Sequence, residues 1–214
     1  GAASVTTPLA SFIIEAAQTP STIEFFRYSP NAPDGMAVRL NGSDHQPSAG
    51  GAFQPVGPLM AAGGNQINRG GPVSLTPATA YFPGEPVIVR VADAGQNGDP
   101  AIVETLIATI RTANGDFVTL RLYESGPDTG EFYAWISSAS GAPVQNDSLL
   151  TIAQGATITA RYQDPFDAAE ISTDTAGVDP FGRVFDSLTG ALIDGASVTI
   201  VDAATGLPAQ VFGI

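Results

Sequence analysis

The clearest pattern in the sequence is a regular alternation of apolar and polar residues along short segments in the middle of the chain. Within residues 86–92, Val87, Val89 and Val91 fall on one side of an extended chain. Successive side chains of a β-strand point to opposite faces of the sheet, so this period of two predicts a strand.

Two more alternating segments, residues 106–111 and 117–123, lie on either side of the pair Asn114-Gly115. An Asn-Gly pair between such segments is a strong hairpin signal, because both residues accept the positive φ of a tight turn. The second segment places its aliphatic residues on one face and its Thr, Arg and Tyr residues on the other. The two segments therefore predict adjacent antiparallel strands in a half-buried sheet.

Similar reasoning predicts strands in other parts of the chain, at residues 11–16, 22–28, 36–40, 131–136, 156–162, 182–186 and 196–201. The 24 glycines and 17 prolines are spread along the sequence, which suits short strands joined by tight turns and disfavours long helices. We therefore predict an all-β fold of tandem immunoglobulin-like β-sandwich domains, with antiparallel sheets and little or no helix.

The length of 214 residues exceeds one sandwich of about 100 residues and is too small for three. Residues 1–70 predict an N-terminal β segment, an incomplete sandwich, and residues 71–165 predict one complete immunoglobulin-like sandwich. Apolar periodicity stops in residues 166–179, which we interpret as an acidic linker. Residues 180–214 predict a truncated β domain that lacks its closing strands.

Charge narrows the range of partners. The chain has 21 acidic residues and 8 basic ones, all arginine, and its net charge is −13. Such a chain repels phosphate backbones and anionic lipid headgroups, which argues against nucleic acid and membrane surfaces as partners. No apolar segment is long enough to span a bilayer, so membrane insertion is not expected either.

One stretch near the centre resembles repeats of very large bacterial surface proteins. An acidic loop at residues 93–100 is followed by the corner Glu124-Ser-Gly-Pro-Asp-Thr-Gly-Glu-Phe132. This combination is similar to bacterial immunoglobulin-like repeats, and the resemblance covers about residues 75–165. It implies a sandwich module located outside the cell or on a bacterial cell surface.

A second stretch, from Gly182 to Thr199, is similar to the start of carboxypeptidase-regulatory-like, transthyretin-like surface domains. The resemblance covers about residues 180–214. Domains of this family are non-catalytic spacers despite their name, so it implies no activity. Relatives that form isopeptide cross-links need a lysine, and this chain has none.

Four residues with side-chain oxygen atoms, Asp93, Asn97, Asp99 and Glu104, stand at positions 1, 5, 7 and 12 of a loop that approaches the EF-hand calcium pattern. Gly95 stands at position 3, where that pattern has a ligand, and strands rather than helices are predicted on both sides. Two interpretations stay open, a calcium site and an acidic turn without an ion.

A candidate binding surface arises from Arg121, Tyr123, Tyr133 and Trp135, which fall on the faces opposite to the aliphatic ones in two neighbouring predicted strands. Exposed aromatic and arginine side chains suit sugar rings or a protein partner. The alternative is that a neighbouring module or loop covers Trp135.

The sequence offers little for catalysis. Cysteine is absent, and the single histidine, His45, is predicted to be exposed in a loop, since adjacent Ser, Asp and His residues do not form a triad. With so few nitrogen and sulfur ligands, zinc sites are not expected. We assign no catalytic residue.

The sequence thus predicts a non-enzymatic structural or adhesive module of a bacterial cell-surface array or extracellular filament. Its partners would be further copies or neighbouring domains of the same array, joined head to tail by strand complementation between incomplete ends. The alternative is a carbohydrate- or protein-binding module that uses the exposed aromatic face to bind a glycan or a host protein.

Overall fold

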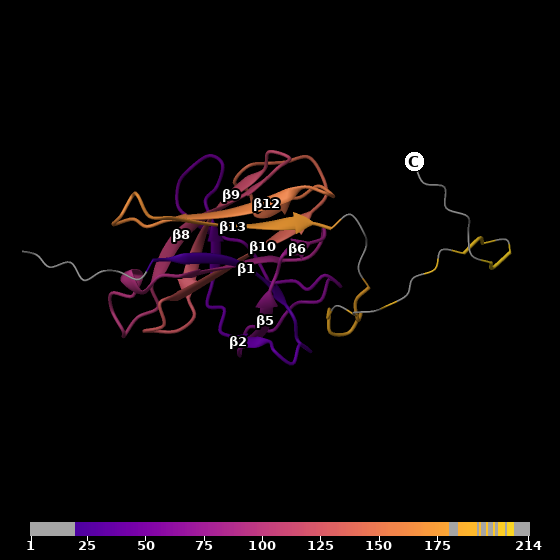
Figure 1. The fold of residues 1–214 in the computed structure, drawn as a ribbon, viewed down its shortest axis with the longest axis horizontal. Helices are drawn as coiled ribbons and strands as arrows, with labels where there is room; N and C mark the ends of the chain where they lie inside the picture. Colours follow the sequence, from indigo (N-terminus) through magenta and orange to yellow (C-terminus); the bar gives the residue numbers. More distant parts are fainter. Residues whose placement is uncertain are drawn as a thin grey trace, which may run out of the picture.

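A computed structural model describes residues 20–179 and 184–191, together with positions 193, 196, 199, 201–203 and 205–207. Within these residues the fold is all-β (Figure 1). The strands are β1 (Thr22–Tyr28), β2 (Met36–Val38), β3 (Ser43–His45), β4 (Gln54–Pro55), β5 (Val73–Pro77), β6 (Ala80–Tyr81), β7 (Val87–Ala92), β8 (Thr105–Thr112), β9 (Phe117–Glu124), β10 (Glu131–Ala139), β11 (Leu149–Thr151), β12 (Thr157–Gln163) and β13 (Ile171–Val178).

Helix is nearly absent, as the sequence predicts. The described residues contain one three-residue 3-10 helix, η1 (Ala94–Gln96), which Asp93 caps by accepting a hydrogen bond from the Gly95 amide. No helix in the described part of the chain has the length and apolar character that crossing a membrane requires.

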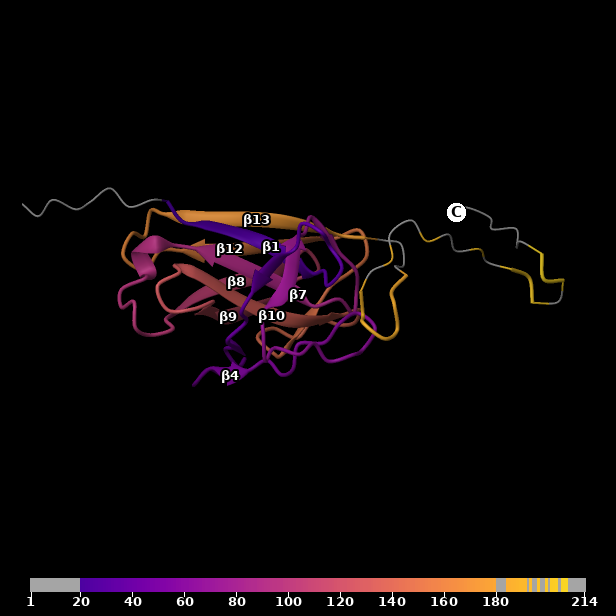
Figure 2. The ribbon, with the colours of Figure 1, turned by 90° about the horizontal axis from the view of Figure 1, so that it is seen from below.

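Most strands follow one path, in the order β2-β5-β1-β7-β10-β9-β8-β12-β13-β6, while β11 pairs with β10 and β3 pairs with β9 and β4. Pairing is antiparallel except for β10 with β11 and β13 with β6. The path curls back on itself, so that β13 lies beside β1 in both views (Figures 1 and 2). The arrangement is consistent with a β-sandwich.

The core lies inside this curl. In β9 the aliphatic residues Val118, Leu120 and Leu122 are fully buried, and the residues between them are only partly buried. The predicted half-buried hairpin is therefore confirmed, with its turn at Gly115, whose φ is 94°. In β7 and β10, by contrast, both faces are largely buried. A loop over residues 56–67 contributes Leu59 to the same hydrophobic core.

Two of the predicted boundaries are wrong. Residue 70 does not separate two units, because β1 pairs with β5 and β7, β3 pairs with β9, and β1, β5, β7 and β9 contribute to one core. Residues 171–178 are not a linker either, because they form β13, which pairs with β12 along its whole length. The strand predicted at residues 11–16, and most of the domain predicted at 180–214, lie outside the described residues.

Candidate functional site

Three loops meet at one end of the molecule, residues 93–104, 124–130 and 164–170, and we call this region the acidic end. Contacts join them, since Gln96 Nε2 lies 3.5 Å from Asp164 Oδ1 and Asn97 Nδ2 donates to Asp128 Oδ1 at 3.0 Å. The loops contain no arginine, lysine or histidine. Their acidic residues are Asp93, Asp99, Glu104, Glu124, Asp128, Asp164, Asp167 and Glu170.

The four predicted calcium ligands lie in this end, but the three acidic ones are not grouped around one point. Asp93 is buried and accepts hydrogen bonds from the Gly95 amide and from the Tyr162 hydroxyl at 2.7 Å. Burial, assisted by this contact, raises the pKa of Tyr162 and keeps its hydroxyl a donor.

Glu104 turns back over its own loop and accepts hydrogen bonds from the amides of Gly98 at 2.7 Å and Asp99 at 3.2 Å. Across the residues that the structure describes, no three His, Cys, Asp or Glu side chains are grouped so as to hold a metal ion. Three of the four predicted ligands, Asp93, Asp99 and Glu104, are therefore not grouped as one ligand set in this structure. Turn amides donate to all three carboxylates, and the Tyr162 hydroxyl also donates to Asp93, which is the arrangement expected of an acidic turn.

The corner that carries the resemblance to surface repeats is organised by one buried carboxylate, that of Glu124. Its Oε1 atom accepts hydrogen bonds from the amides of Thr129 at 2.7 Å and Gly130 at 2.8 Å, and its Oε2 atom accepts one from the Glu104 amide at 3.3 Å. Burial opposes ionisation, but these donors outweigh it and lower the pKa of Glu124. The motif thus fixes the turn between β9 and β10.

The predicted aromatic surface is not exposed. Tyr133 and Trp135 are only 1% and 2% exposed. The Tyr133 hydroxyl donates to Glu131 at 3.0 Å, and its ring packs edge-on against Phe26. The Trp135 indole donates to the carbonyl of Gly57 at 3.3 Å. The alternative, that a loop covers Trp135, is confirmed. The prediction of an exposed aromatic surface is wrong, because that loop packs over β10.

Arg121 and Tyr123 remain partly exposed, but both are directed at Asp44 on the neighbouring strand β3. The Tyr123 hydroxyl donates to Asp44 at 2.7 Å, and the Arg121 guanidinium lies 3.5 Å from the same carboxylate and over the ring of Phe53. The four residues predicted as one surface are therefore divided between a half-exposed pair and a buried pair.

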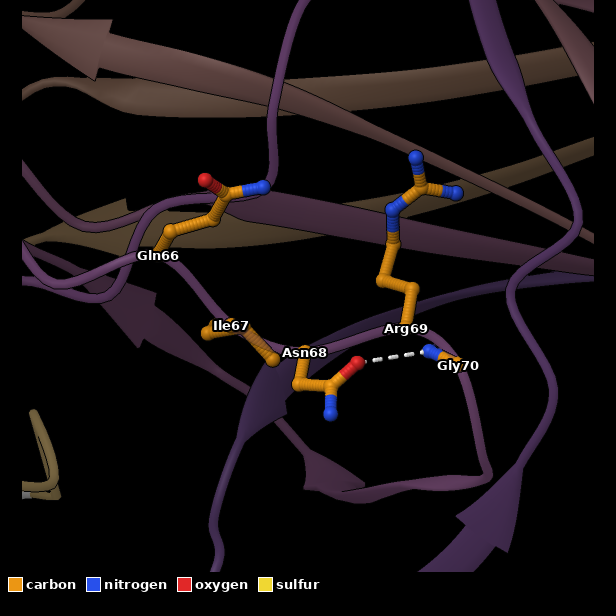
Figure 3. Close-up of a pocket in the computed structure, with 5 residues that line it drawn as sticks. All are labelled: Gln66, Ile67, Asn68, Arg69 and Gly70. Carbon is orange, nitrogen blue, oxygen red and sulfur yellow. Dashed lines mark hydrogen bonds between the residues drawn. The ribbon is translucent and has the colours of Figure 1, made fainter.

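Residues 66–70 line a cavity of about 520 Å³. Figure 3 shows these five residues. Gln66 and Arg69 extend to the same side of the loop, and Asn68 accepts a hydrogen bond from the Gly70 amide at 2.8 Å. The Arg69 guanidinium lies 4.3 Å from the centre of the Trp135 ring. The Arg69 side chain therefore covers the Trp135 indole.

His45 is not in an exposed loop, and that prediction is wrong. It belongs to β3, is 7% exposed, and pairs with Leu120 of β9 and Gln54 of β4. Its Nδ1 atom has no hydrogen-bond partner among the described residues. The side chain is part of the packed interior, because the alternation in β3 directs His45 inward and Asp44 outward.

The contact between β1 and β13 closes the curled sheet, and we call it the seam. At residues 21–25, hydrogen bonds between side chains and the main chain join the two segments, rather than main-chain pairing. Asp174 accepts a hydrogen bond from the Phe25 amide at 3.0 Å, and Glu170 accepts one from the Ser21 amide. Ser172 donates to the Ser21 carbonyl at 2.7 Å. Sequence reasoning missed these residues, since nothing in a single strand reveals which edge it will meet.

Comparisons with known proteins do not extend these observations. Neither a scan against protein-family models nor a search of curated protein sequences finds a match for this chain. The class that the structure defines is that of an all-β protein with a closed seam and an acidic end. The resemblance to bacterial surface repeats stays a prediction.

We expect Glu124→Gln to destabilise the protein by about 1.5–3 kcal/mol, because an amide replaces a buried charged acceptor of several main-chain donors. Since folding lowers the pKa of Glu124 below its ordinary value of 4.5, its ionised form stabilises the fold at neutral pH. This contribution is lost as the pH falls through the lowered pKa. Denaturant unfolding of both proteins at neutral and acidic pH measures the difference, which should shrink in acid.

Glu131→Gln is the control for this prediction, because the Glu131 side chain is 42% exposed, pairs with Arg90 at 3.5 Å, and as a glutamine keeps an acceptor for the Tyr133 hydroxyl. We expect it to cost less than about 1 kcal/mol. Equal costs for the two substitutions would contradict the assigned role of Glu124.

Trp135 is the only tryptophan of the chain, so fluorescence reports its environment directly. We expect Arg69→Gly to expose the indole, shift its emission to longer wavelength and increase quenching by acrylamide, whereas Arg69→Met should keep it covered. Emission and quenching that are the same in Arg69→Gly and the wild-type protein would show that Arg69 does not shield the ring.

Proposed function

We propose that this chain is a non-enzymatic structural or adhesive module of a bacterial cell-surface array or extracellular filament, located outside the cell. Its partners are neighbouring copies or domains of the same array. Strand complementation would join these copies head to tail, as the sequence predicts.

The observation that carries this proposal is the position of the two points where the chain enters and leaves the folded body. Ser21 contacts Glu170 and Ser172, at the start of β13. Residue 179 follows the end of β13, whose eight residues span about 26 Å. The chain therefore enters at the acidic end and leaves at the opposite end (Figure 2). This geometry suits modules connected in line.

The direction of the seam strands adds a second argument. Ser21 meets Ser172 and Phe25 meets Asp174, with nearly constant sequence separations of 151 and 149, so β1 and β13 run parallel. Tension applied at the two ends would pull β1 and β13 in opposite directions along their length. All bonds across the seam would then be loaded together, rather than opened one after another. Such a seam suits a module under tension.

We expect Asp174→Ala to weaken the protein under tension, because it leaves the Phe25 amide without its acceptor at a cost of about 1–2 kcal/mol. Forced unfolding depends on the unfolding rate, so the full chain held by its two ends should unfold about 5–30 times faster. Single-molecule force spectroscopy measures this rate.

Thr173→Ala is the matched control, since Thr173 lies on the same strand but is exposed and faces away from the seam. It should unfold at the same force as the wild-type chain. If Asp174→Ala also leaves the unfolding force unchanged, the seam does not carry tension and the proposed function loses its main support.

A further inference from the structure

The outer face of strands β8, β9, β12 and β13 differs in charge from the rest of the molecule. Its positions alternate with the buried ones along each strand. It holds seven threonines, three of the 8 arginines and no carboxylate, in a chain of net charge −13. We call it the threonine–arginine face; its residues are Thr105, Ile107, Thr109, Arg111, Phe117, Thr119, Arg121, Tyr123, Thr157, Thr159, Arg161, Gln163, Ile171, Thr173, Thr175 and Gly177.

Strand register arranges these side chains in rows across the sheet. One row runs Thr173, Arg161, Thr109, Thr119, because each is the partner of the next in the pairing of β13, β12, β8 and β9. Directly paired residues lie about 5 Å apart on the same face. The rows therefore form a continuous surface of hydroxyl and methyl groups with arginines set among them.

Two of these arginines lack a carboxylate partner among the described residues. Arg121 is held by Asp44 at the margin of the face. Arg111 is exposed and lies 4.7 Å from the centre of the Phe117 ring, and Arg161 is exposed and donates to Gln163 at 3.0 Å. An exposed guanidinium without a carboxylate beside it is available to pair with an anionic partner.

The chain itself supplies the complementary surface. The acidic end carries eight acidic residues and no basic one, so its charge is opposite to that of the threonine–arginine face. Both surfaces also expose apolar groups, with Phe166 81% and Ile102 52% exposed at the acidic end, and Ile107 and Ile171 about half exposed on the face. Arginine and aromatic residues are the types enriched in protein interfaces.

We propose that the threonine–arginine face is the docking surface for the acidic end of a second copy of this chain. The two surfaces are different parts of the molecule, so the contact is heterologous and each copy keeps one free surface of each kind. Repetition of such a contact gives an open-ended assembly unless the rotation closes a ring. This inference rests on the proposed function and names the partner of that array.

Sedimentation velocity on the full chain tests the docking. Wild-type protein should associate at about 0.01 M salt, where the Debye length is about 30 Å, and dissociate at about 1 M, where it is about 3 Å. Arg161→Glu should weaken the association at least about tenfold, because it places a like charge against the acidic end. Arg39→Glu makes the same charge change at an exposed position outside the face and should leave the association unchanged.

A mixing experiment tests that the contact is heterologous. Asp167→Arg alters the acidic end and should weaken association as Arg161→Glu does. An equal mixture of the two variants should associate again, because the intact acidic end of one fits the intact face of the other. The proposal would be overturned if Arg161→Glu and Arg39→Glu weakened the association equally. It would also be overturned if the mixture of Arg161→Glu and Asp167→Arg stayed monomeric.

Three further outcomes separate this inference from the proposed function. A wild-type chain that stays monomeric at low salt, but binds polygalacturonate through Arg161, would assign the face to an acidic polysaccharide and refute self-docking. A monomeric chain whose Asp174→Ala variant still unfolds faster under tension would leave the proposed function standing without this partner. Self-docking of the wild-type chain, together with an Asp174→Ala variant that unfolds no faster under tension, would support this inference and remove the main support of the proposed function.

Discussion

Closure of the curled sheet at the seam is the constraint on which the rest of the structure depends. An edge strand leaves amide groups that water, another strand or a side chain must satisfy. At Ser21, just before β1, and at Phe25 within it, the acceptors are the carboxylates of Glu170 and Asp174. Beyond Phe25 the main chain takes over, since Ala78 donates to the Phe25 carbonyl at 2.8 Å and β6 pairs with the end of β13.

The same use of carboxylates recurs inside the molecule and gives part of the acidic composition a structural meaning. Asp116 is almost fully buried and accepts a hydrogen bond from the Thr151 amide at 2.6 Å, and burial raises its pKa. Glu124 and Asp93 likewise accept main-chain amides at turns. Turns and edges of a sheet leave amide donors, and an ionised acceptor binds them more strongly than a neutral one. The net charge of −13 is thus not only a surface property.

The sequence predicts those strands whose pattern reflects a single buried face. β9 alternates regularly, so its position follows from the period of two, and the valines at every second position predict β7 as well although both of its faces are largely buried. β13 escapes this reasoning because its inner positions include Ser172 and Asp174, which meet β1 rather than an apolar core. Its sequence therefore has the appearance of a linker.

The candidate site was less predictable, for a related reason. Alternation in β10 correctly separates Trp135 from the aliphatic residues but does not indicate what covers the second face. That depends on a loop without periodicity, which places Gly57 and Arg69 on the indole. Spacing alone also suggested that Asp93 and Glu104 share an ion, whereas each has its own amide donors. Long-range packing decides the first point, and hydrogen bonds within the loop decide the second.

Alternation in β13 joins the two functional proposals in one element. Its even-numbered residues Ser172 and Asp174 hold β1 across the seam, and its odd-numbered residues Thr173 and Thr175 belong to the threonine–arginine face. Tension arriving through residue 179 acts along this strand. A copy docked on the face would contact the same strand from outside and add contacts that must break before β13 slides. Because anything bound only to the folded form stabilises it, assembly and resistance to tension would reinforce each other.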